Sequence, residues 1–223
     1  MKNYFEALQG CPLFAGIDRA DMEALLRCLS SRQKSYAKNG FIWEEGGAAG
    51  DLGVVLSGSA LILREDFWGR RKILTRIGRG GLFGEAFAFA GAQKLPFGVI
   101  AAEESDILFL NCRHIMDPCE SACSFHGGLI KNLVLILADK NITLTQKLEH
   151  VTQPTTREKL LSYLSEQSRL SGSGTFDIPY SREELADYLS VERSAMSAEL
   201  SRMRRDGLVD YNKNHFELLR KEN

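Results

Sequence analysis

The sequence predicts an α+β chain in which an all-β domain, a long helix and a helix-turn-helix follow one another. Three patterns carry this prediction: short apolar runs separated by glycines over residues 35–110, a heptad repeat over residues 130–151, and two helices joined by a tight turn within residues 181–207. The 223 residues are enough for two domains. The net charge of −1 argues against binding to nucleic acid or membrane through bulk charge, so any such contact must come from a local patch.

Composition indicates a cytoplasmic protein. No apolar run approaches the length of a membrane span, and residues 1–10 lack the apolar core of a signal peptide. The five cysteines are an odd number and lack the spacing of a disulfide framework. We therefore expect free thiols, a reducing compartment and no membrane partner.

The all-β domain follows a helical segment and is built from short strands. Asp18 is a candidate N-cap for a helix whose leucines recur at helical intervals. From residue 35 the pattern changes to apolar runs with glycine between them. These runs are FIW, LGVVL, SALIL, RKILTRI, FGVIAA and DILFL. Short strands with turn signals at this spacing predict a sandwich or a barrel.

A long helix is predicted from Asp117–Pro118 to about Val151, and Pro154 closes it. Its apolar positions alternate in spacings of four and three, which is typical of a two-stranded coiled coil. A single Asn in such a seam fixes the register, which favours a parallel homodimer over a helix packed only on its own domain. The expected dimer interface consists of Ile130, Val134, Leu137, Asn141, Leu144 and Leu148.

The last third of the chain predicts a helix-turn-helix followed by a hairpin. A helix with a capping box at Ser181 and Glu184 breaks at Ser190–Val191 and then restarts. Met196, Leu200 and Met203 share one face of the second helix, and we expect that face to be buried. Residues 208–219 form the expected hairpin, the wing of a winged helix.

The opposite, polar face of the second helix suits the major groove of DNA. Serines allow close approach, and arginine can bind guanine through two hydrogen bonds. The candidate DNA-binding residues are Ser181, Arg182, Arg193, Ser194, Ser197, Ser201 and Arg204. The alternatives are a helical pair in a core and a surface for protein–protein contact in a ligand-binding module. No nucleophile–base pair, Walker loop or H-E-x-x-H motif supports an enzyme.

Nearly the whole chain resembles the CRP/FNR family of bacterial transcription regulators. The first domain carries the family's G-x-I-x-x-E-G outline at residues 40–46, VLSGSA at 55–60 and FGE at 83–85. The S-R-x-x-[VL]-[AG] opening of the family's helix-turn-helix is present at residues 181–186. Arg193, Ser194 and Ser197 match the recognition-helix pattern, whereas Ala198 replaces its final arginine, so the operator should differ there.

The resemblance implies a double-stranded β-helix (jelly-roll) sensor domain at residues 1–117, a dimerisation helix at 118–152 and a winged helix-turn-helix domain at 153–223. It implies an effector-responsive homodimer on a pseudo-palindromic operator in double-stranded DNA. RNA polymerase is a further candidate partner, although no contact surface for it is recognisable in the sequence.

The resemblance also places an effector pocket at Gly84, Glu85, Lys94, Leu95 and Phe97. In members that bind cyclic nucleotides, the glutamate of FGE accepts a ribose hydroxyl, and an Arg followed by Ser or Thr neutralises the phosphate. Glu85 is present here, but the Arg-Ser position falls on Leu95–Pro96, and neighbouring Lys94 lacks the bidentate fork. We therefore expect no response to cyclic AMP. The apolar segment suits an apolar small molecule or simple core packing.

Cysteines offer a second class of effector site. The closely spaced cysteines of the FNR branch are missing, so an FNR-type iron–sulfur cluster is not expected. Cys119, Cys123 and His126 would share one face of a helix that begins at Pro118, and Cys112, on the last strand, is expected nearby. Three explanations stay open: small apolar fillers, thiols that respond to oxidation, and a metal or haem site.

Overall fold

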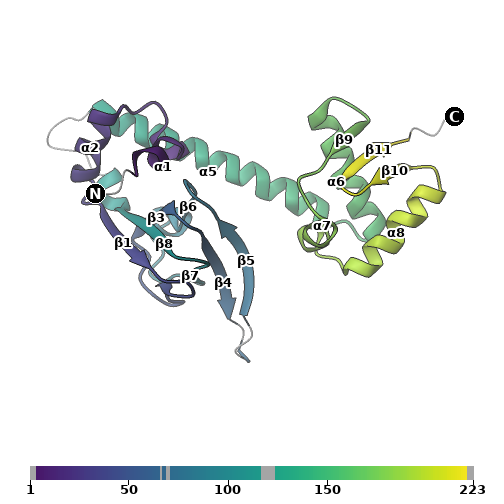
Figure 1. The fold of residues 1–223 in the computed structure, drawn as a ribbon, viewed down its shortest axis with the longest axis horizontal. Coiled ribbons are helices and arrows are strands. Elements are labelled where there is room, and N and C mark those ends of the chain that lie inside the picture. Colours follow the sequence, from purple (N-terminus) through teal and green to yellow (C-terminus); the bar gives the residue numbers. More distant parts are fainter. Residues whose placement is uncertain (1–3, 66, 69–70, 117–123, 220–223) are drawn as a thin grey trace. The chain divides into compact units, whose positions relative to one another are not determined.

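The computed structural model describes residues 4–65, 67–68, 71–116 and 124–219 (Figure 1). The chain divides into two compact units, residues 1–138 and 139–223, which are described separately below. The boundary between the units lies inside one long helix, so the predicted division at residues 117 and 152 stays a prediction. Within the described residues, no helix is long and apolar enough to cross a membrane.

The N-terminal segment is helical, as the sequence predicts. It contains α1 (Phe5–Gln9), a 3-10 turn at Pro12–Phe14 and α2 (Arg19–Cys28). The Asp18 side chain accepts a hydrogen bond from the backbone N–H of Asp21 at 2.9 Å, which confirms the predicted N-cap of α2.

Two antiparallel four-stranded sheets follow, so of the predicted sandwich or barrel the domain forms the sandwich. One has the order β1 (Arg32–Tyr36), β8 (Ser105–Asn111), β3 (Asp51–Ser57) and β6 (Leu82–Phe83); the other has β2 (Phe41–Trp43), β7 (Gly98–Ala101), β4 (Ala60–Glu65) and β5 (Arg71–Ile77). A short helix, α3 (Glu85–Phe89), follows β6. Strand β1 was not predicted, because four of its five residues are exposed and no apolar run marks it.

Two hydrophobic layers use opposite faces of the first sheet. On β8, Leu108 and Leu110 belong to the cluster that includes the N-terminal helices, whereas Ile107 and Phe109 belong to the cluster between the sheets. This is why DILFL is a continuous apolar run rather than an alternating one. Gly53 on β3 allows the close approach of a ring, because a Cβ there would lie 2.2 Å from Phe83.

The chain then forms α4 (Cys112–Met116) and the long helix α5 (Ser124–Val151). The predicted start of the long helix at 117–118 lies outside the described residues, and its predicted end at Val151 is confirmed. In the first unit, Leu129 and Leu133 are buried in the cluster of the N-terminal helices. Asn132 Nδ2 donates to the carbonyl oxygens of Leu13 at 3.0 Å and Ala15 at 2.8 Å.

The second unit is a winged helix-turn-helix (Figure 1). Its elements are α6 (Thr156–Ser171), β9 (Thr175–Asp177), α7 (Arg182–Leu189), α8 (Arg193–Arg205), β10 (Val209–Asn212) and β11 (His215–Leu218). The strands form an antiparallel sheet in the order β10-β11-β9. Ser190 joins α7 to α8 with a left-handed backbone, φ 52°. Fully formed capping boxes begin α6 at Thr155 and α7 at Ser181.

The last turn of α5 is held against α6 by a buried histidine. His150 is 3% exposed, and its Nδ1 lies 2.8 Å from Ser162 Oγ. The ring packs edge-on against Tyr163, with centroids 5.7 Å apart. Burial lowers the pKa of His150, and the nearby carboxylates of Glu149 and Glu166 oppose this shift. Burial therefore favours the neutral imidazole.

Because the folded pKa of His150 is lowered, we predict that the unfolded chain takes up the proton first as the pH falls. The free energy of unfolding should then decrease as the pH is lowered through the ordinary histidine range, from about 7 to 5. His150→Gln should make this decrease shallower in urea unfolding at fixed protein concentration. Parallel pH profiles of the original chain and the variant would contradict the assignment.

Candidate nucleic-acid interface

Helix α8 has one buried face and well-defined ends. Met196, Leu200 and Met203 are buried in the core of the second unit, as the sequence predicts. The Glu192 side chain caps the helix and accepts a hydrogen bond from the backbone N–H of Ala195 at 2.8 Å. At the other end, Gly207 leaves the helix with φ 68°.

The opposite face of α8 is exposed and polar. The five candidates on this helix (Arg193, Ser194, Ser197, Ser201 and Arg204) are all exposed. Ser197 Oγ donates to the Arg193 carbonyl and Ser201 Oγ to the Ser197 carbonyl, each at 2.9 Å. With their hydrogens directed to the helix, these oxygens can still accept hydrogen bonds, which matches the amino groups of adenine and cytosine in the major groove.

Arg204 is directed toward the wing. Its Nη2 lies 2.7 Å from Asp210 Oδ1, and its Cζ lies 5.4 Å from the ring centroid of Tyr211. Both partners belong to β10. Arg204 therefore ties the end of α8 to the wing, and a role in DNA contact stays a prediction for this residue.

Arg182 also lies over the ring of Tyr211, and it lies over the ring of Phe216 as well. Its Cζ is 4.7 Å from the ring centroid of Tyr211 and 4.8 Å from that of Phe216. Both terminal nitrogens are buried and have no hydrogen-bond partner among the described residues. Burial lowers the pKa of Arg182. The preceding Ser181 hydroxyl accepts from the Glu184 backbone N–H at 3.3 Å, so this candidate caps α7.

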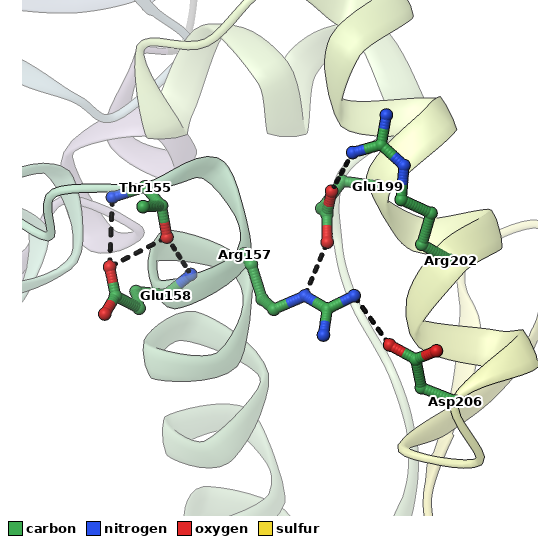
Figure 2. Close-up of polar contacts among 6 residues, drawn as sticks. All are labelled: Thr155, Arg157, Glu158, Glu199, Arg202 and Asp206. Carbon is green, nitrogen blue, oxygen red and sulfur yellow. Dashed lines mark hydrogen bonds and ion pairs between the residues drawn. The ribbon is translucent and has the colours of Figure 1, made fainter.

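An ion network behind α8 was missed by the sequence pattern (Figure 2). Glu199 lies on the buried side of the helix, 7% exposed. Its carboxylate binds Arg157 from α6 and Arg202 from α8, each at 2.6 Å. The available signal was the helical position of Glu199, beside Met196 and Leu200 on the face expected to be buried, where a carboxylate needs a partner.

The predicted effector-pocket residues lie around one loop of the first unit. Gly84 begins α3 with φ 83°, and a Cβ there would lie 2.4 Å from the Trp43 ring. Glu85 is buried, and Lys94 is exposed. Leu95, 2% exposed, and Phe97 are buried in the cluster between the sheets.

Backbone hydrogen bonds fix the position of Leu95. Its N–H donates to the Gly47 carbonyl at 2.9 Å, and its carbonyl accepts from the Gly46 N–H at 2.8 Å. The next residue, Pro96, has no N–H to donate. A packed leucine therefore lies where the family resemblance predicts the cation for a cyclic phosphate, and the expected lack of a cyclic AMP response stays a prediction.

Two of the described thiols, Cys112 and Cys11, are buried, whereas Cys28 is half-buried. Cys112 begins α4 instead of lying on the last strand, which corrects the sequence prediction. Burial, followed by the charges of Asp51 and Glu85, raises the pKa of Cys112 to about 12. Burial likewise raises the pKa of Cys11 to about 11.

The predicted cysteine–histidine group is only partly covered by the structure. Cys119 and Cys123 lie outside the described residues. His126 is buried, and its two ring nitrogens have no hydrogen-bond partner among the residues that the structure describes. Across that same part of the chain, no three ligand-type side chains gather as a metal site would require.

Two family models match the chain in the order of its domains. The cyclic nucleotide-binding domain matches residues 33–121, and the Crp-like helix-turn-helix domain matches residues 158–223. The chain belongs to the CRP/FNR family. Members of this family are transcription regulators rather than enzymes.

Known proteins resemble this family member over different lengths. A 64-residue segment is 38% identical to the transcriptional activator protein FnrL of Cereibacter sphaeroides and spans 25% of this chain and 26% of that relative. The c-di-GMP responsive global regulator CLP of Xanthomonas campestris has a similar structure, with a TM-score of 0.58 and 19% identity over 92% of this chain and 100% of that one. A CooA mutant from Carboxydothermus hydrogenoformans has a TM-score of 0.56 and 16% identity, covering 87% and 85%. Such identities establish the fold alone.

Because its hydroxyl caps α7, Ser181→Ala is predicted to lower the free energy of unfolding by about 1 kcal/mol. Ser181→Thr retains a capping oxygen and should lose much less. Urea unfolding of the full chain measures both. An alanine variant as stable as the original chain would contradict the capping role.

Proposed function

We propose that this CRP/FNR family member is an effector-responsive, DNA-binding transcription regulator that acts in the cytoplasm as a homodimer. The observation that carries the proposal is the two-sided character of α8. Its apolar side is buried in the core, and Arg193, Ser197 and Ser201 are exposed along the opposite side. A helix presenting small hydroxyls and a guanidinium suits the major groove, with the wing beside it on the backbone.

The exposed seam of α5 supports a dimer. Leu144 and Leu148 are 66% and 60% exposed in the single chain, and Val134 is also exposed. Asn141 lies between Val134 and Leu144 in this seam, and a polar residue at such a position fixes the register of a two-stranded coiled coil. The remaining seam residues, Ile130 and Leu137, are half-buried in the first unit. A second copy of α5 would cover these apolar side chains.

Dimerisation sets the form of the operator. Two recognition helices related by a twofold axis bind a pseudo-palindrome whose half-sites lie about one helical turn apart, ~10 base pairs. Position 198 is alanine, so a contact from that position to a base through a long side chain is lost. RNA polymerase is the partner through which such a regulator would act on transcription.

The effector that we propose is not cyclic AMP. The buried Leu95 and the missing donor at Pro96 leave a phosphate without a paired cation in the loop that follows Glu85. An unidentified small molecule or a redox signal would instead bias the dimer helices and thereby the two recognition helices. Cys119, Cys123 and His126 remain the candidates for a redox or metal signal.

We predict that Arg193→Ala weakens binding to the chain's own upstream DNA by at least about tenfold, because a bidentate base contact is lost in each half-site. Lys213→Ala removes one positive charge at the wing tip and should change affinity little. Fluorescence anisotropy with excess competitor DNA measures both variants against the original chain. Equal operator affinity in the Arg193 variant would contradict the docking, and absence of specific binding by the original chain would favour a protein–protein role.

Cyclic AMP in large excess is predicted to leave both the DNA affinity and the thermal midpoint unchanged, because a ligand of the folded state would raise that midpoint. The same anisotropy titration and a thermal melt provide the two measurements. A rise in midpoint together with tighter DNA binding would overturn this part of the proposal.

Mild, reversible oxidation in a parallel titration tests the cysteines, with a chain carrying Cys119→Ser and Cys123→Ser as control.

A further inference from the structure

Arg157 connects two helices of the DNA-binding unit through a single side chain (Figure 2). It is the second residue of α6, and its guanidinium spans two positions on α8. Its Nε lies 2.6 Å from Glu199 Oε1, and its Nη2 lies 2.7 Å from Asp206 Oδ2. Asp206 caps the C-terminus of α8, so one guanidinium holds both the middle and the end of the recognition helix.

Glu199 is the residue of α8 that needs the cation of Arg157. Its carboxylate is buried beneath α8, and a buried carboxylate is costly unless it is paired. Arg202 also binds Glu199, at 2.6 Å, but it lies on α8 itself, three residues away. Among the described residues, Arg157 is the cation that reaches Glu199 from another element. The hydrogen bond from Arg157 is the leading cause of the lowered pKa of Glu199.

The position of Arg157 is fixed at its own end by a capping box. Glu158 Oε2 accepts from the Thr155 backbone N–H at 3.1 Å and from the Thr155 hydroxyl at 2.7 Å (Figure 2). Helix α5 ends at Val151, and Pro154 lies just before this box. Arg157 therefore extends from the first turn of α6, the helix that follows α5.

Apolar packing alone would hold α8 less specifically. Leu160 and Leu164 of α6 share a core with Met196, Leu200 and Met203 of α8. Such burial is non-directional and tolerates small slides and rotations of one helix over another. Paired hydrogen bonds from a planar guanidinium have a defined geometry and select one arrangement.

We propose that Arg157 is a positioning residue that sets the orientation of α8 relative to the start of α6, and that operator discrimination depends on it. This inference rests on the proposed function. In a dimer, a small rotation of α8 misplaces two recognition faces at once. Sequence-specific binding should therefore be lost before non-specific binding, which depends on charge and tolerates misalignment.

The test compares Arg157→Gln with Arg202→Gln in the full-length dimer. Each variant removes one arginine that binds Glu199, but only the first breaks the connection between α6 and α8. The readout is the ratio of dissociation constants for a scrambled duplex and for an operator selected by the original chain, at one salt concentration. We expect Arg157→Gln to lower this ratio by at least about tenfold, the loss expected when base contacts are misplaced, and Arg202→Gln to change it less than about twofold.

Two further variants separate positioning from folding. Arg157→Lys keeps one cation but not the fork, so the ratio should recover in part. Asp206→Ala removes one arm of the bridge at a half-exposed site and should give an intermediate loss even if Arg157→Gln does not fold. Circular dichroism and thermal melts confirm that each variant is folded at the temperature of the binding assay.

The outcomes distinguish this inference from the proposed function. If the original chain does not prefer any operator, the proposed function fails before the variants are compared. If it does, a folded Arg157→Gln chain with an unchanged ratio overturns the positioning role. Equal losses in Arg157→Gln and Arg202→Gln also overturn it, because they would assign the effect to the charge around Glu199 rather than to the bridge between helices.

Discussion

Burial of one side of α8 is the constraint on which the DNA-binding unit depends. Met196, Leu200 and Met203 each contribute about 1.5–3 kcal/mol by leaving water, and this fixes which side of the helix remains outside. A rotation that buried Ser197 or Ser201 would desolvate hydroxyls and expose methionines. The exposed polar face of α8 is thus a consequence of core packing. Hydrophobic burial determines which face of the helix is exposed, and polar contacts then define its orientation more closely.

In the first unit, too, hydrophobic burial determines which side chains remain available for polar contacts. After β6, Gly84 has a left-handed backbone conformation and Glu85 is buried, at the positions where the sequence predicts an effector pocket. Leu95 and Phe97, however, complete the hydrophobic layer between the sheets, together with Trp43 and Phe83. A side chain that fills the core cannot also neutralise a ligand. The first unit therefore keeps the fold of a cyclic nucleotide-binding domain, while Leu95 and Phe97 serve its hydrophobic core.

Local signals predicted most of the fold, and non-local pairing explains what was missed. The capping box at Ser181, the break at Ser190 and the C-terminal hairpin are each specified within a few residues, and all are present. Strand β1 lacks an apolar face, so periodicity could not mark it. Arg157 and Glu199 are 42 residues apart, and no local pattern connects them.

Candidate sites were harder to predict than elements, for a related reason. A helical wheel identifies which residues of α8 are exposed, but it does not predict which tertiary partners a long side chain contacts. Arg182 and Arg204 are arginines at positions typical of DNA contact, yet both guanidiniums pack against Tyr211 of the wing. Their partners come from a strand that follows in the sequence and is placed only by the tertiary fold.

The most direct test of the central claim is selection of binding sites from a pool of random-sequence duplexes by the full-length chain, followed by hydroxyl-radical footprinting of the enriched DNA. The account predicts an enriched pseudo-palindrome, with two protected segments whose centres lie about one helical turn, ~10 base pairs, apart on one face of the duplex. A pool that shows no enriched motif after exposure to the folded chain, or a single unpaired protected segment, would contradict it.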